Sequence, residues 1–145
     1  MKLYQFDGVD DALLLLPMAA RRALDLAGRK LSLAAWQAAP LGLRQALVEE
    51  GSRGEPDATA ALSVIQRIDA SAAEVVPLTD PPPTEAPAAV VEIYGSARPL
   101  GANLWRRLSP LDRYALVKVT RSRHPQRLQA AYDELVGPLH RDGSQ

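Results

Sequence analysis

The stretch "LWRRLSPLDRYALVK", Leu104–Lys118, repeats a pattern that the chain already shows in its first half. Sixty-nine positions earlier, Ala34–Glu49 reads "AAWQAAPLGLRQALVE", and the two stretches align without a gap. The sequence therefore predicts one structural unit used twice: a helix, a short turn around a tryptophan, and two further helices. The identical positions in the two stretches are Trp36 and Trp105, Arg44 and Arg113, Ala46 and Ala115, Leu47 and Leu116, and Val48 and Val117.

The composition favours helices over sheets. Of the 145 residues, 47% are hydrophobic but only 5% are aromatic, with a single phenylalanine. The interior must therefore be built from alanine, leucine and valine, and alanine and leucine are strong helix formers. No stretch forms a convincing strand. We expect an all-α fold, a compact helical domain made of two similar helix–turn–helix–helix halves joined by a Pro-rich linker.

Proline and glycine mark where the helices should begin and end. Pro17 and Pro40 stand where a first helical turn accepts proline, and Gly28 and Gly51 stand where a helix can stop. Ser109 reads as an N-cap before Pro110. The expected helices cover residues 17–28, 40–51, 56–73, 87–97, 109–120 and 125–137, with short turns at 32–38 and 101–108.

The densest proline run divides the chain. Five of the twelve prolines lie within Val75–Pro87, a density that helices and central strands do not tolerate. Neither half would bury enough surface alone, so we expect both to pack about a pseudo-twofold axis into one domain. The expected parts are an N-terminal segment 1–16, a first helical repeat 17–74, a Pro-rich linker 75–86, a second helical repeat 87–140 and a disordered tail 141–145.

The residue content excludes several classes of protein. The chain has no cysteine, which excludes disulfides, cysteine-held metal sites and thiol catalysis. The apolar run "ALLLL" follows acidic residues, whereas a signal peptide needs preceding positive charge. No segment is apolar enough over about 20 residues to span a bilayer. We therefore expect a cytoplasmic protein that makes no use of a membrane.

The two repeated pairs of residues have a structural and a functional interpretation. Trp36 and Trp105 are the only tryptophans, and each is either a core anchor or a platform on which a ligand stacks. Arg44 and Arg113 lie between apolar neighbours three and four residues on, so each needs a nearby partner for its charge. That partner is either the protein itself, which would make the arginine structural, or a bound anion.

The two halves differ most in their charge. Glu49–Glu92 holds nine acids and two arginines, a net charge of −7, whereas Arg98–Arg127 holds eight bases and one acid, a net charge of +7. The basic run "KVTRSRHPQR", Lys118–Arg127, aligns with the acidic "EEGSRGEPDA" of the first half. Such a run either complements the C-terminal end of its helix or forms a docking surface for an acidic protein or a phosphate.

No catalytic or cofactor-binding pattern is present. The two histidines, His124 and His140, lack the spacing of a metal site. The chain has no glycine-rich phosphate loop and no nucleophile elbow. We expect a protein that is not an enzyme and holds no cofactor and no metal.

Both halves resemble the nitrate reductase-associated proteins. In the first half the shared elements are Phe6, Pro17-Met18, Arg21, Leu24-Asp25, Gly28, Lys30 to Leu33 and Trp36. In the second half they are Trp105, Arg113 to Leu116, Lys118, Thr120-Arg121 and His124. The individual elements are short, but their order is specific, and together they span most of the chain.

The resemblance implies a non-catalytic accessory protein that binds the catalytic subunit of assimilatory, molybdenum-dependent nitrate reductase and supports its maturation or activity. Two alternatives stay open. One is a small-anion-binding helical sensor with a pocket between the repeats, lined by the four repeated residues. The other is a nucleic-acid-binding regulator using the basic second half, which the zero net charge disfavours. The candidate partner-binding residues are Arg21, Lys30, Lys118, Arg121, Arg123 and His124.

Overall fold

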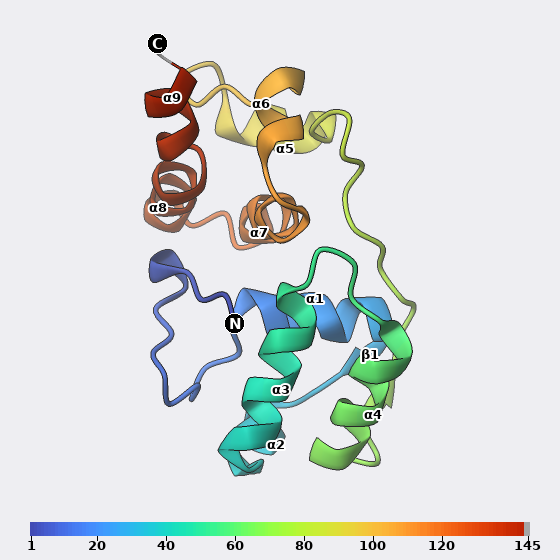
Figure 1. Ribbon diagram of the computed structural model, residues 1–145. Coiled ribbons are helices and arrows are strands. Elements are labelled where there is room, and N and C mark those ends of the chain that lie inside the picture. The colour runs from blue at the N-terminus through green and yellow to red at the C-terminus, as the bar shows by residue number, and fades with distance from the viewer. Residues whose placement is uncertain (144–145) are drawn as a thin grey trace. The chain divides into compact units, whose positions relative to one another are not determined.

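Helices make up most of the computed structural model, which describes residues 1–143 (Figure 1). The all-α prediction is confirmed, and the first half begins with a short 3-10 helix, η1 (Gln5–Asp7). Its α-helices are α1 (Met18–Ala27), α2 (Leu33–Ala38), α3 (Leu41–Ser52) and α4 (Ala58–Ile68). The second half contains α5 (Ala88–Tyr94), α6 (Ala102–Arg107), α7 (Pro110–Thr120), α8 (Pro125–Leu135) and α9 (Gly137–Gly143).

Several helix ends differ from the sequence expectation, and α5, expected over residues 87–97, ends at Tyr94 because Gly95 follows with a positive φ of 76°. Gly51 was expected to end its helix, but α3 continues to Ser52, and the glycine serves close packing instead. A Cβ added at Gly51 would lie 1.7 Å from the carbonyl oxygen of Ala19 in α1, so α1 and α3 touch at this point. The helix expected over residues 56–73 ends at Ile68, because the carboxylate of Asp69 accepts hydrogen bonds from the backbone and hydroxyl of Ser71 in a local turn.

A two-stranded antiparallel ladder was not expected from the sequence. Strand β1 (Arg29–Lys30) pairs with β2 (Ala73–Glu74), with Arg29 opposite Glu74. The ladder is two residues long on each side, too short for an alternating pattern to reveal it. It joins the end of α1 to the chain that leaves the first half.

The start of the expected linker is bound to α1. The backbone N–H groups of Val75 and Leu78 donate to the carbonyls of Gly28 and Asp25, both at 2.9 Å. Gly28 ends α1 with a positive φ of 67°, as expected, and a Cβ there would lie 2.8 Å from both the ring of Pro77 and the oxygen of Val75. This position therefore requires glycine for its backbone angle and for its space.

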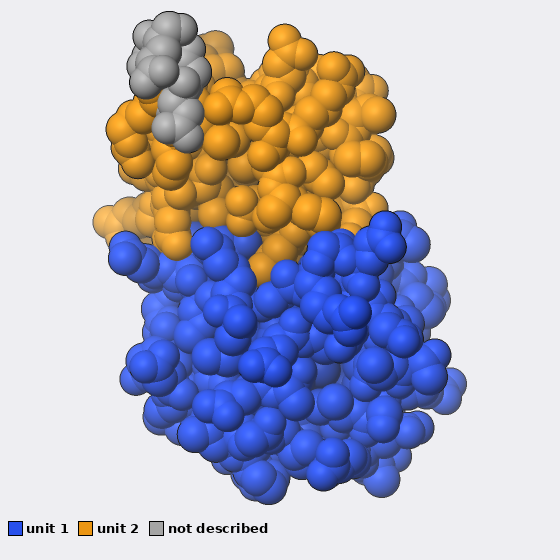
Figure 2. All heavy atoms as spheres, viewed as in Figure 1, with its two compact units in different colours: residues 1–79 blue, residues 80–145 orange. Residues whose placement is uncertain are grey.

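The chain divides into two compact units, Met1–Thr79 (unit 1) and Asp80–Gln145 (unit 2), shown in different colours in Figure 2. Each unit has buried apolar side chains around its own tryptophan. In unit 1 the fully buried large side chains include Tyr4, Leu13, Trp36, Leu47, Val48 and Ile65. In unit 2 they include Tyr94, Trp105, Leu116, Val119 and Val136.

The contacts around the two tryptophans match at the same 69-residue offset. The indole Nε1 of Trp36 donates to the carbonyl of Leu13 at 2.7 Å, and that of Trp105 donates to the carbonyl of Pro82 at 2.7 Å. Helices α2 and α6, which carry the two rings, also have bounds 69 residues apart. These matches support the predicted internal repeat, while the shared core about a twofold axis stays a prediction.

The Pro-rich segment therefore does more than join two helices. Its residue Pro82 holds the place in unit 2 that Leu13 of the N-terminal segment holds in unit 1. Helix α9 extends through Gly143, so part of the expected tail 141–145 is helical, and residues 144–145 lie outside the described residues.

Tyr94 of unit 2 has an unusual hydroxyl group. The residue is 2% exposed, and its hydroxyl has no hydrogen-bond partner within residues 1–143. Burial raises the pKa of Tyr94 well above its usual value, and the positive charge of Arg98, whose guanidinium lies 5.1 Å from the centre of the ring, opposes this shift. Folded unit 2 therefore favours the neutral phenol.

We expect the raised pKa of Tyr94 to make the protein less stable in alkali. Above about pH 10 the unfolded chain loses this phenolic proton while the folded chain keeps it, so the free energy of unfolding falls as pH rises. Replacing Tyr94→Phe should remove this contribution and leave stability at neutral pH unchanged or higher by about 1 kcal/mol. Urea unfolding of both proteins at about pH 7 and pH 11 measures the difference.

Tyr132→Phe is the matched control for this prediction. The hydroxyl of Tyr132 donates to the carbonyl of Pro99 at 2.8 Å, so its removal should cost about 1 kcal/mol at neutral pH. A loss at Tyr94→Phe as large as that at Tyr132→Phe would contradict the account of the unpartnered hydroxyl.

Candidate partner-binding surface

Four of the six candidate residues lie together at one end of α7. The loop Arg121–His124, here called the basic loop, joins α7 to α8, and the side chains of Arg121, Arg123 and His124 are exposed. Within residues 1–143 these three side chains form no ion pair. Lys118, in the last turn of α7, is half-buried with its ammonium 5.9 Å from the ring centre of Tyr114.

The backbone of the basic loop is held by short-range contacts. The hydroxyls of Thr120 and Ser122 donate to the carbonyls of Val117 and Val119, at 2.5 and 2.8 Å. Arg123 adopts a positive φ of 51°, a conformation that is uncommon for residues other than glycine. The loop thus fixes its own path with small polar side chains, and its charged groups face solvent.

The other two candidates belong to unit 1. Arg21 in α1 is half-buried, and its Nε donates to the carbonyl of Leu16 at 3.2 Å, so part of its guanidinium is already used. Lys30 in β1 is exposed. The structure therefore groups Lys118, Arg121, Arg123 and His124 on one continuous stretch and leaves Arg21 and Lys30 on the other unit.

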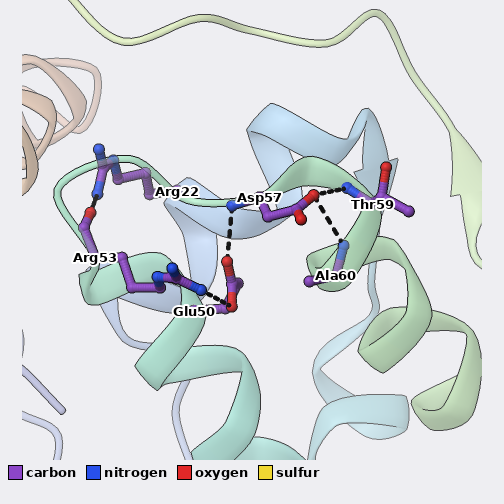
Figure 3. A network of polar contacts seen from close by, with 6 residues as sticks. All are labelled: Arg22, Glu50, Arg53, Asp57, Thr59 and Ala60. Carbon is purple, nitrogen blue, oxygen red and sulfur yellow. Dashed lines mark hydrogen bonds and ion pairs between the residues drawn. The ribbon is translucent and has the colours of Figure 1, made fainter.

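The loop that corresponds to the basic loop in unit 1 is fixed by a network of polar contacts (Figure 3). Glu50 accepts from the guanidinium of Arg53 at 3.4 Å and from the backbone N–H of Asp57 at 2.7 Å. The carboxylate of Asp57 in turn caps α4 by accepting from the backbone of Thr59 and Ala60, at 2.9 and 3.3 Å. The charged side chains of this loop therefore stabilise the local structure of unit 1.

Arg22 completes this network, although no pattern in the sequence predicted it. The residue is 0% exposed, and its guanidinium donates to the carbonyls of Gly51, Arg53 and Gly54 at 2.9, 2.5 and 3.0 Å. In the sequence Arg22 looks like a surface base beside Arg21. The nearest available signal is the pair of glycines, Gly51 and Gly54, since glycine lets a backbone lie close to another group.

Unit 2 lacks every anchor of this network. At the 69-residue offset, Arg22, Glu50 and Asp57 correspond to Val91, Val119 and Gln126. The two connecting loops therefore use their charge differently. In unit 1 charged side chains bind the loop to the core. In unit 2 the exposed arginines and the histidine take no part in fixing the loop, which is held by short-range hydrogen bonds.

The repeated tryptophans and arginines lie in the interior. Trp36 and Trp105 are both 0% exposed, which fits a core anchor rather than a surface for stacking a ligand. One guanidinium nitrogen of Arg44 donates to the carbonyls of Ala12 and Leu13 at 2.7 and 3.0 Å, and one of Arg113 donates to that of Leu108 at 2.5 Å. These bonds join each arginine to the backbone beside its tryptophan.

Among the described residues, no group of three or more His, Asp or Glu side chains could hold a metal ion. No helix of residues 1–143 has the length and apolar character needed to cross a membrane.

The fold and this surface define the class of protein. It is a small helical protein in two compact units, with an exposed basic loop at the end of one helix. The chain belongs to the family of conserved nitrate reductase-associated proteins, whose model matches residues 3–135. The resemblance seen in the sequence is therefore confirmed. No curated protein and no solved structure matches the chain.

Proposed function

We propose that this protein is a non-catalytic, cytoplasmic accessory protein that binds the catalytic subunit of assimilatory, molybdenum-dependent nitrate reductase and supports its maturation or activity. The family description, which names an association with nitrate reductase, supports this role. The main reason for placing the docking surface on the basic loop is the contrast between this loop and the corresponding loop of unit 1. Exposed arginines on a loop that does not need them for its own fold suit an acidic patch on a partner.

The basic loop is the first surface to test. We expect the protein to co-purify with the nitrate reductase catalytic subunit at about 0.15 M salt, and more weakly as salt rises, because exposed charge pairs are screened. The double variant Arg121→Glu and Arg123→Glu should weaken the complex by about tenfold or more, since repulsion replaces attraction at two rim positions. Isothermal titration calorimetry measures the change.

A matched control changes the same charge elsewhere on unit 2. Arg106 and Arg107 are exposed in the last turn of α6, and reversing both to Glu gives the same net charge as the loop variant. We expect this control to bind within about twofold of the unchanged protein. Equal weakening by the two double variants would show that only net charge matters and would overturn the assignment to the loop.

Two further readouts separate the parts of the proposal. No complex with either the cofactor-loaded or the empty catalytic subunit would overturn the accessory role. Adding the protein during cofactor insertion and, separately, to the mature enzyme distinguishes maturation from activity, because only the former requires it to be present early. Lys30→Glu and Arg21→Glu test whether unit 1 contributes contacts.

A further inference from the structure

The chain that leaves unit 1 is exposed over its last residues. Every residue from 73 to 78, which covers β2 and the start of the Pro-rich segment, is exposed. Val76, at 81% exposure, is the most exposed large apolar side chain among residues 1–143, and Val75 and Leu78 are 44% and 40% exposed. Three such side chains within four positions are more typical of an interaction surface than of a solvated turn.

The outer edge of β2 carries backbone groups that unit 1 does not use. In an antiparallel ladder, alternate residues turn their N–H and C=O groups toward the partner strand. The N–H of Val75 donates to the carbonyl of Gly28, directly before β1, at 2.9 Å. Glu74 and Val76 therefore turn their backbone groups away from β1. The N–H of Val76 has no hydrogen-bond partner within residues 1–143.

Two features that commonly protect the edge of a sheet do not protect this one. Such an edge is often closed by a proline, which lacks an N–H, or by a charged side chain. Pro77 stands at a position that faces unit 1, since a Cβ at Gly28 would lie 2.8 Å from its ring. The carboxylate of Glu74 is paired with the guanidinium of Arg29 at 3.2 Å. The outward edge of residues 74–76 is therefore able to accept another strand.

A second copy of the same edge fits these groups in one register. With Val75 opposite Val75 of the second copy, Glu74 of each chain lies opposite Val76 of the other. All outward N–H and C=O groups of these two residues are then paired, in four hydrogen bonds about a twofold axis. A register centred on Glu74 would set two carboxylates against each other. One centred on Val76 would pair Glu74 with Leu78, whose N–H already donates to Asp25.

We propose that the protein self-associates through this edge as a twofold dimer in which the two copies of β2 pair. Strands β1 and β2 of both copies then form one four-stranded antiparallel sheet, with the two Val75 side chains as a close cross-strand pair. Because the paired segment is short, we expect a weak dimer, with a dissociation constant on the order of 0.1 mM. The contact does not use the basic loop, so it is independent of the proposed docking to nitrate reductase.

Sedimentation equilibrium of the full chain tests the association. We expect the unchanged protein to pass from monomer to dimer between about 10 µM and 1 mM. Val76→Pro removes an outward N–H that unit 1 does not use, so it should weaken the dimer about tenfold or more while the monomer still folds. Val76→Thr is the control, because it keeps both the N–H and the branched shape, and it should bind within about threefold of the unchanged protein. A protein that stays monomeric at 1 mM, or a dimer that Val76→Pro leaves unchanged, would overturn the proposal.

Single cysteines test the register, and they do not depend on whether Val76→Pro folds. The chain has no cysteine, so one introduced thiol has only a second copy as its disulfide partner. Opposite residues of a non-hydrogen-bonded pair have Cα atoms about 4.5 Å apart, a distance that a disulfide spans. Val75→Cys should therefore cross-link under mild oxidation at least tenfold faster than Val76→Cys, whose two copies would be offset by roughly 7 Å along the strands.

Val91→Cys is the matched control for the cross-linking. Val91 lies in α5 of unit 2 and is 40% exposed, close to the 44% of Val75, so the two thiols are similarly accessible. We expect Val91→Cys to cross-link as slowly as Val76→Cys. Similar rates at all three positions would indicate random collision and would overturn the proposed pairing.

Discussion

Replacing Gly51→Ala should destabilise the protein by roughly 3 kcal/mol or more, although the same change inside a helix usually stabilises. The reason is the backbone of α1, whose Ala19 carbonyl oxygen lies 1.7 Å from the place where the new methyl group would stand. Backbone cannot rotate aside as a flexible side chain can, so α1 and α3 would have to separate. Urea unfolding followed by far-UV circular dichroism measures the loss.

Gly42 in the same helix is the control for this prediction. A Cβ at Gly42 would meet nothing within 4 Å, so Gly42→Ala should leave stability unchanged or raise it by up to about 1 kcal/mol. If the two variants shift the urea midpoint in the same direction, the close contact between α1 and α3 is not what selects glycine at position 51.

The second large effect is expected at Arg22→Met, which should lower the free energy of unfolding by about 3–5 kcal/mol. Methionine keeps much of the buried volume but donates no hydrogen bonds, so the carbonyls of Gly51, Arg53 and Gly54 would lose their shared donor. The loop between α3 and α4 should loosen with them. Hydrogen exchange of the amides from 52 to 60 would report this loosening beside the urea midpoint.

Arg67→Met provides the comparison, because Arg67 is exposed in the last turn of α4. Its loss should change stability by no more than about 0.5 kcal/mol. An effect of Arg22→Met no larger than that of Arg67→Met would mean that the three carbonyls are satisfied in some other way.

The helices were predictable because residues at or next to their ends mark where they begin and stop. Proline begins α7 and α8, Ser32 caps α2 by accepting from the backbone of Ala35 at 3.0 Å, and Gly28 ends α1 in the left-handed conformation. Such signals act within one turn of the residue that carries them. The bounds of the two segments expected at 32–38 and 101–108 agree within a residue with α2 and α6, although both segments were expected to be turns and are short helices.

The anchors of unit 1 were not predictable, because their partners lie far along the chain. Arg22 bonds to carbonyls 29–32 residues away, and Gly51 touches a residue in a different helix. Nothing near either residue in the sequence distinguishes a buried arginine from a surface one, or a packing glycine from a helix stop. Both assignments depend on how α1 crosses α3, which the hydrophobic pattern alone does not determine.

The candidate surface was partly predictable. The basic run was visible as a difference between two aligned copies, and the structure shows Arg121, Arg123 and His124 exposed on one loop. The exposure of Leu14 and Leu15 was not predicted, because "ALLLL" has the composition of a core. Only exposure separates Leu13, which is 0% exposed, from Leu14, which is 53% exposed.

The bond from Trp105 to Pro82 bears on how a doubled chain of this kind could arise. A copied piece of gene that began at the first helix of the repeat would have left the second tryptophan without a carbonyl to bond. If the repeat arose by duplication, the copied piece included the coding sequence for the segment ahead of the helix, since that segment supplies the carbonyl that Trp105 bonds. Since the contact uses a main-chain oxygen, it does not depend on the side chain, and leucine in one unit and proline in the other accept the same bond.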